Sequence, residues 1–380
     1  MSVATSSRIR SLDGLRGIAA VVVLLAHALA LTPELAVPHV TASSVDPGNL
    51  VAWAMWHTPL HLLWAGPEAV YVFFILSGIV LTLPVLRSKR FDWRSYYPKR
   101  LVRLYIPVIG AVLLASASLL FFPRFIEDGD SVFLEGKIGL LSASSIAKDA
   151  SLLFGISGNL GVLWSLRWEV LFSLMLPLYV FSVGIWAKGI WIKFAVILVL
   201  IGVGGVATQP VLFYMPMFAV GSLIASELDR IQLMFKRLSK TAWRLLALAA
   251  VLLTSSYWMV MPFWDGWSAE GAFRIPVFLG TVLIVMLGAF WGTAVRFLNL
   301  SAIQWLGRIS FSLYLVHEPV VVTLGFALGS HSSLLAGFLS IVLSVLLAWA
   351  FFHLVEAPSH TLSVKVGRAI GQTRGETPGT

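Results

Sequence analysis

The sequence has no cysteine and few charged residues. The absence of cysteine excludes disulfide bonds and thiolate metal sites. Only 12% of the 380 residues are Asp, Glu, Lys or Arg, about half the share of an average soluble domain. The eight histidines show none of the HxxH, HxH or HExxH spacings typical of metal sites, so we expect no bound metal.

Hydrophobic residues make up 58% of the chain, which is more than a soluble core can bury. A transmembrane helix needs about 20 mostly apolar residues, and such runs recur along the chain. The sequence therefore predicts an all-α, polytopic membrane protein with about ten transmembrane helices, near 16–32, 68–86, 104–122, 162–183, 191–207, 210–227, 243–262, 274–291, 308–328 and 334–356. The stretch 138–156 carries Lys148 and Asp149, and we expect it to lie in the membrane interface.

Positive charges fall mostly in the loops on one side of these spans. With a cytoplasmic N-terminus, the inner side receives Arg8, Arg10, Arg87, Lys89, Arg90, Arg94, Lys99, Arg100, Arg103, Lys188, Lys193, Arg230, Lys236, Arg237, Lys240, Arg244, Arg296, Arg308, Lys365, Arg368 and Arg374. The outer side receives only Arg124, Lys137, Lys148 and Arg274. This asymmetry follows the positive-inside rule, and an odd number of spans would scramble it. We therefore expect both termini in the cytoplasm, and we assign the net charge of +9 to contact with anionic lipid and not with nucleic acid.

Polar residues inside predicted spans are candidates for function, because hydrocarbon disfavours them. Ten residues separate Arg16 from His27, so His27 lies about 16 Å further along a helix, within the bilayer. A buried imidazole tends to stay neutral and can accept a proton, although a structural histidine bonded to another helix is an equal alternative. Glu169 is expected at a similar depth, where its carboxylate would orient His27; an ion pair with Arg167 is the alternative.

Two further stretches carry polar groups at helical spacing. Arg100 and Arg103, with Lys99, form a cluster at a helix entrance in YPKRLVRLYIP (97–107), where guanidinium groups suit phosphate. On the residues alone, ordinary topology-setting charge with lipid-headgroup binding is the favoured interpretation of this cluster. Ser310, Tyr314 and His317 fall on one stripe of LGRISFSLYLVHEPVV (306–321), which predicts either a cavity wall or hydrogen bonds between helices.

These stretches together resemble the integral-membrane acyltransferase family 3. RSLDGLRGIAA with Arg16 and His27 resembles that family's Arg-x10-His signature, and PKRLVRLYIP resembles its RR-x-x-R-x-x-P block, with Lys99 replacing the first arginine. VYVFFILSGIVLT, LWSLRWEVLFSLMLP, LGRISFSLYLVHEPV and FFHLVEAPSH are similar to its other blocks, in the same order, from about residue 8 to 360. This chain departs from the family's pattern at Ile79, Phe311 and Ala357, where the family usually has Phe, Tyr and Arg.

The resemblance implies an enzyme that moves an acyl group, usually acetyl, from cytoplasmic acyl-CoA to a hydroxyl group of a carbohydrate or other acceptor. It implies a transmembrane domain over 1–360 and a cytoplasmic tail over 361–380, in a cell (inner or plasma) membrane of bacterial type. His27 and Glu169 would be catalytic, and Arg16, Arg100, Arg103 and Lys99 would hold the donor. The expected acceptor-binding residues are Trp164, Ser165, Ser77, Tyr314, His317 and Glu68.

Several questions stay open on the sequence. The acceptor is a polysaccharide, glycolipid, peptidoglycan or small secreted metabolite, and a homo-oligomer or a separate acceptor-modifying partner fits equally. The long loop from 33 to 67 carries His57, His61 and Trp64; Trp64 suits the membrane interface, and the two histidines have no assigned role. The alternative function is a proton-coupled transporter or flippase of a glycoconjugate, since intramembrane Arg, His and Glu also form proton relays.

Overall fold

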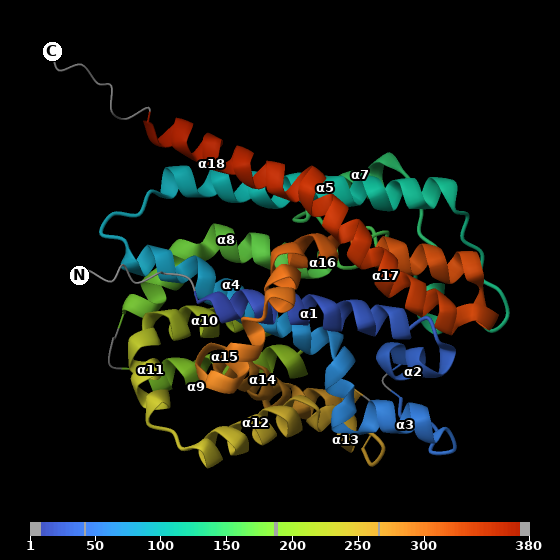
Figure 1. Cartoon of the computed structure of the whole chain (residues 1–380), viewed down its shortest axis with the longest axis horizontal. Helices are drawn as coiled ribbons and strands as arrows, with labels where there is room; N and C mark the ends of the chain where they lie inside the picture. The colour runs from blue at the N-terminus through green and yellow to red at the C-terminus, as the bar shows by residue number, and fades with distance from the viewer. Residues whose placement is uncertain (1–8, 42, 186–188, 265–266, 373–380) are drawn as a thin grey trace.

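A computed structural model describes residues 9–41, 43–185, 189–264 and 267–372, and the regular elements in these ranges are all helices (Figure 1). The first half of the chain forms α1 (Arg10–Leu29), α2 (Pro33–Thr41), α3 (Leu50–His57), η1 (Pro59–Trp64), α4 (Gly66–Arg87), α5 (Trp93–Phe121), α6 (Val132–Glu135), α7 (Ala143–Ser151) and α8 (Leu163–Gly184). The second half forms α9 (Ile190–Val206), α10 (Pro210–Ser226), α11 (Leu228–Lys236), α12 (Lys240–Thr254), α13 (Ser256–Val260), α14 (Trp267–Phe290), α15 (Gly292–Leu298), α16 (Ser301–Leu328), η2 (Ser330–Ser332), α17 (Ser333–Phe351), η3 (Phe352–Glu356) and α18 (Ala357–Gln372). The predicted all-α class is therefore confirmed for the described residues.

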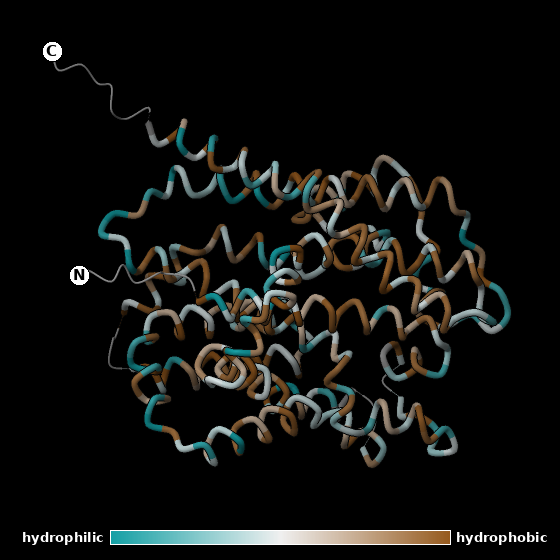
Figure 2. The backbone as a smooth tube through the Cα atoms, in the orientation of Figure 1, coloured by the Kyte–Doolittle hydropathy of each residue, from teal (hydrophilic) through white to brown (hydrophobic). Residues whose placement is uncertain are grey.

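Seven of these helices are long and apolar enough to cross a membrane, or up to eight if the bent pair α10 and α11 forms one span. Every one of the ten predicted ranges overlaps at least one helix, but α9 has 17 residues and α12 has 15, shorter than a simple span. The count of ten is thus not confirmed. Figure 2 shows hydrophobic residues along most of the helices and hydrophilic ones mainly at helix ends and turns.

Helix α1 lies at the centre of the molecule, packed against α16, α4 and α17 (Figure 1). Small residues allow its close approach to α16: a Cβ atom added to Gly17 would lie 2.5 Å from the main-chain nitrogen of Gly307. The α4–α10 contact is similar, because a Cβ atom on Gly78 would come within 2.8 Å of the Gly221 Cα. Such contacts between small residues are typical of helix packing in membranes.

Two segments outside the predicted spans are also ordered. Helix α7, within the predicted interfacial stretch, has nine residues and is too short to cross a bilayer. Most of the predicted tail is helical, since α18 continues to Gln372 and packs along α5. Residues 373–380 of that tail, with Arg374, and the predicted cytoplasmic charges Arg8 and Lys188 lie outside the described residues.

The start of α1 and the end of α18 lie toward the same side of the molecule (Figure 1). Helices α2 and α3 lie toward the opposite side, near the end of α1 that carries His27. Helix α1 therefore runs from the side where α18 ends to the side of α2 and α3.

Candidate active site

Helix α1 carries Arg16 in its second turn and His27 near its other end. Its first helical residue is Arg10, six residues before the predicted start of the span, so Arg16 lies within the helix and not at its entrance. Gly17 lets this helix pack closely on α16, which brings His27 beside His317. The His27 Nδ1 and His317 Nε2 atoms are 2.9 Å apart, a hydrogen-bond distance.

The hydrogen bonds of His317 define which ring nitrogens carry protons when both rings are neutral. His317 is fully buried, and its Nδ1 lies 3.0 Å from the main-chain oxygen of Leu313. A carbonyl oxygen only accepts, so His317 Nδ1 must donate, and its Nε2 must accept the proton from His27 Nδ1. The lone pair of His27 is then on Nε2, and this nitrogen would act as the base.

His27 lines a cavity of about 430 Å³ between α1, α4, α6, α8 and α16, a volume within the usual range for ligand sites. Trp164, Tyr314, Lys137 and Glu318 also line it. Glu318 is 2% exposed and forms an ion pair with Lys137, while its second oxygen accepts a 2.7 Å hydrogen bond from the Val162 main-chain nitrogen. The cavity thus combines an imidazole base with a cation that is held in place by a buried carboxylate.

A second group of polar residues surrounds Glu169. Asp92 caps the start of α5, accepting from the main-chain nitrogens of Arg94 and Ser95, and two turns later Arg100 reaches α8. The Arg100 Nη2 atom is 2.6 Å from Glu169 Oε1, and its Nε donates to Ser173 Oγ at 3.1 Å. Ser77 of α4 donates to the same Glu169 oxygen at 3.4 Å. Glu169 therefore positions Arg100.

Arg16, Arg100 and Arg103 line one small cavity of about 60 Å³, together with Glu169 and Glu356. Glu356 is itself held by Ser312, whose hydroxyl donates to Glu356 Oε2 at 2.5 Å. Arg16 and Arg103 also line a larger neighbouring cavity of about 300 Å³ toward the start of α1. Three guanidinium groups face two carboxylates here, so one positive charge is in excess.

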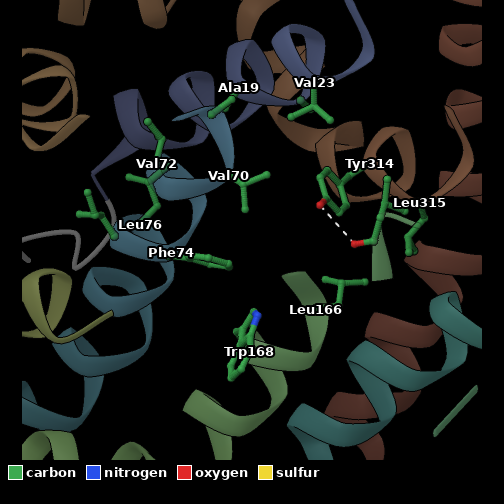
Figure 3. Close-up of a cluster of buried hydrophobic side chains, with 14 of the residues drawn as sticks. Ala19, Val23, Val70, Val72, Phe74, Leu76, Leu166, Trp168, Tyr314 and Leu315 are labelled. Carbon is green, nitrogen blue, oxygen red and sulfur yellow. Dashed lines mark hydrogen bonds between the residues drawn. The ribbon is translucent and has the colours of Figure 1, made fainter. Parts of the chain in front are cut away.

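A narrow space of about 20 Å³ lies between the arginine cavity and the His27 cavity. Arg16 and Glu169 line it and the arginine cavity, while Val70 and Tyr314 line it and the His27 cavity. Tyr314 forms a 2.6 Å hydrogen bond with Ser165 here, and Figure 3 shows its ring among Val23, Val70, Phe74 and Leu166. The cavities therefore form one series from Arg103 to His27.

The structure brings most of the predicted site residues to this series of cavities. Arg16, Arg100, Arg103, Glu169 and Ser77 gather at one end, and His27, His317, Trp164, Ser165 and Tyr314 gather at the middle and the other end. The predicted stripe on α16 divides, because Ser310 and Tyr314 line the narrow space and His317 bonds His27.

Three expectations about individual residues differ from the structure. Glu169 lines the arginine cavity with Arg100 and His27 lines another, so the expected Glu169–His27 pair is replaced by the His27–His317 pair. Lys99 is exposed and lies beside α18, where a Cβ atom on Gly367 would be 3.5 Å from its Cβ. Glu68 lines a separate cavity with Trp258. Lys99 on α5 and Glu68 on α4 therefore lie against neighbours outside the arginine and His27 cavities.

Lys137, Glu318 and Glu356 are polar wall residues that the sequence reasoning did not select. The charge pattern predicts an outer loop for Lys137. Glu318 and Glu356 lie within the segments 306–321 and 351–360, where the sequence gives them no separate role. Lys137 and Glu318 are 181 residues apart, so no local spacing indicates that they pair. A carboxylate inside an apolar run was the available signal for Glu318.

Comparison with models of protein families matches residues 9–353 to a model described as an acyltransferase domain. The chain belongs to acyltransferase family 3. No curated protein and no solved structure matches it. This acyltransferase family 3 protein is therefore a multi-pass membrane acyltransferase. Its polar side chains gather in the cavities described above.

Proposed function

We propose that the protein is an O-acyltransferase that moves an acyl group, acetyl in the simplest case, from cytoplasmic acyl-CoA to a hydroxyl group of an extracytoplasmic acceptor. The observation that carries this proposal is the series of cavities from three arginines to His27. The arginine end would face the cytoplasm of a bacterium, in its inner or plasma membrane. The acceptor would be a carbohydrate, a glycoconjugate or another hydroxyl compound.

The arginine end suits the donor. CoA carries several phosphate groups, and guanidinium forks bind phosphate through paired charge-assisted hydrogen bonds. Arg103 is exposed at this end, while Arg100 is fixed by Glu169 and Ser173. The excess positive charge of this cavity favours an anionic ligand, and the neighbouring 300 Å³ cavity offers room for the rest of the CoA.

The His27 end suits the transfer step. His27 Nε2 takes the proton from the acceptor hydroxyl, and the hydroxyl oxygen attacks the thioester carbonyl carbon. The tetrahedral intermediate then collapses, the C–S bond breaks, and the imidazolium returns its proton to the departing thiolate, giving an ester and CoA. His317 Nε2 accepts the Nδ1 proton of His27 throughout, which keeps the ring oriented, as the aspartate does in a Ser-His-Asp triad.

Lys137 is a cation in the wall of the same cavity. Positive charge near the thioester carbonyl would stabilise the oxyanion that forms there, a contribution that is large in sites shielded from water. The Glu318 carboxylate holds the Lys137 ammonium group in position. The same Nε2 lone pair also permits attack on the thioester to give an acyl-histidine, which rapid acid quenching and mass spectrometry would detect at His27.

Acyl-CoA turnover tests the proposed function. The purified protein would be incubated with acetyl-CoA and longer-chain acyl-CoA, with and without a panel of hydroxyl acceptors, and free thiol would be followed for wild type and His27→Ala. Thiol release by the wild type, lost in a folded His27→Ala variant, is the expected result. A folded wild type that neither binds acyl-CoA nor releases thiol with any acceptor would reject the enzyme in favour of a proton-coupled transporter or flippase.

A further inference from the structure

A separate cavity of about 110 Å³ lies next to the His27 cavity, and Pro67 lines both. Its walls come from α2, α4, α13 and α14. Two carboxyl groups and one guanidinium group line it, from Glu68, Glu270 and Arg274, and aromatic rings of Tyr71, Tyr257 and Trp258 lie beside them. The chemistry proposed for His27 uses none of these residues.

The polar atoms of this cavity are incompletely satisfied. Glu68 is 6% exposed; its Oε1 accepts a 3.1 Å hydrogen bond from Trp258 Nε1. Arg274 Nη2 lies 3.1 Å from Glu270 Oε1. Within the part of the chain that the structure describes, the buried atoms Glu68 Oε2, Glu270 Oε2 and Arg274 Nε have no hydrogen-bond partner. Buried polar atoms without partners cost free energy, so a ligand or ordered water that bonds them would be stabilised in this cavity.

The unsatisfied atoms define the chemistry of that ligand. Two are acceptors and one is a donor, so the ligand must both donate and accept. An ammonium group cannot accept from Arg274, and an anion cannot donate to the carboxylates. Neighbouring hydroxyl groups do both, and aromatic rings provide an apolar face for the carbon skeleton that carries them.

We propose that this cavity is a carbohydrate subsite, in which Glu68, Glu270 and Arg274 bind the hydroxyl groups of one sugar ring of the acceptor. The assignment rests on the proposed function, because the shared wall at Pro67 would place this ring next to the hydroxyl that reacts at His27. The volume of about 110 Å³ is several times the roughly 10–15 Å³ that a cavity needs to hold one water molecule. The cavity therefore fits a hydroxyl-bearing part of an acceptor and not a whole polymer.

Saturation-transfer NMR on the purified full-length protein tests the subsite. The detergent must have no sugar headgroup, and the probes are methyl β-D-glucopyranoside, galactose and N-acetylglucosamine, with tetrahydropyran-2-methanol as a ring that lacks neighbouring hydroxyl groups. We expect at least one sugar to bind and the control ring not to bind. In Glu68→Gln and Glu270→Gln, an amide nitrogen replaces an acceptor oxygen, and the affinity should fall about tenfold or more.

Matched controls separate this proposal from general effects of mutation. Glu227→Gln makes the same change in an ion pair with Arg230, and neither residue lines this cavity. This variant should bind sugar as the wild type does. Thermal melts would show whether each variant is folded. His27→Ala should keep sugar binding. Absence of thiol release from a folded wild type that still binds sugar would reject the proposed function and leave the subsite standing. Absence of sugar binding in the wild type, or unchanged affinity in both folded glutamine variants, would overturn the subsite.

Discussion

Replacing His317 is the sharpest perturbation of the proposed transfer step. His317 does not line the arginine cavity, the narrow space or the His27 cavity. It bonds His27 at 2.9 Å and the Leu313 carbonyl at 3.0 Å. His317→Leu removes the acceptor for the Nδ1 proton of His27. His317→Gln keeps a side-chain oxygen that can accept in its place.

The magnitude follows from the charge that develops during transfer. His27 becomes an imidazolium, and a hydrogen bond to a charged group contributes about 1.5–3 kcal/mol. Each 1.36 kcal/mol of transition-state stabilisation corresponds to a factor of ten in rate. We therefore expect kcat to fall about ten- to a hundred-and-fifty-fold in His317→Leu, with a smaller loss in His317→Gln.

The assay is steady-state thiol release from acetyl-CoA for wild type, His317→Leu, His317→Gln and the control His353→Leu, which alters an exposed histidine. His317 positions the base and does not bind the donor, so the KM for acetyl-CoA should stay within about twofold. Equal kcat in wild type and a folded His317→Leu would refute the tautomer argument. A rise in KM without loss of kcat would assign His317 to binding instead.

Three other changes test separate parts of the site. Arg103→Gln should weaken CoA binding, measured by isothermal titration calorimetry, about three- to tenfold and reduce its dependence on salt, whereas Arg94→Gln, an exposed arginine on the same helix, should not; equal affinities would contradict the assignment of the donor end. Phe311→Ala, which widens the narrow space beside the arginine cavity, should raise kcat/KM for six- to eight-carbon acyl-CoA relative to acetyl-CoA, and an unchanged ratio would show that this passage does not select the acyl chain. Burial lowers the pKa of His57, whose Nε2 accepts from the Val45 main-chain nitrogen, so the unfolded chain binds its proton more readily and stability should fall as the pH drops below about 6.5. His57→Gln should reduce the difference between melting temperatures at pH 7.5 and 5.5, and a difference equal to that of the wild type would contradict this.

Local sequence pattern predicted the helices well, because hydrophobic runs and helical periodicity are properties of neighbouring residues. The same logic identified Arg16, His27, Arg100 and Arg103, which are polar groups within or beside apolar runs. Local pattern could not predict which of these side chains contact one another, or which other residues they contact. Glu169 is expected beside His27, but its partner depends on how α5 packs against α8, and in the structure Arg100 binds it.

Contacts between distant segments account for the rest of what the sequence did not predict. The His27–His317 pair joins residues 290 apart, and the Lys137–Glu318 pair joins a loop to a buried helix. The span count was uncertain for a related reason. Helices such as α9, with 17 residues, are apolar enough to resemble spans, and their length alone does not decide whether they cross the membrane.

The path of the acyl group is the central claim, and photocrosslinking measures it most directly. A thioether analogue of acyl-CoA, which cannot transfer its chain, would carry a diazirine at the end of that chain, and the crosslinked residues would be located by mass spectrometry. We expect crosslinks to the walls of the His27 cavity, at residues such as Val23, Phe133 and Trp164, with competition by free CoA and weaker labelling in Arg103→Gln at subsaturating analogue. Labelling confined to other faces of the protein, or labelling that free CoA does not reduce, would contradict it.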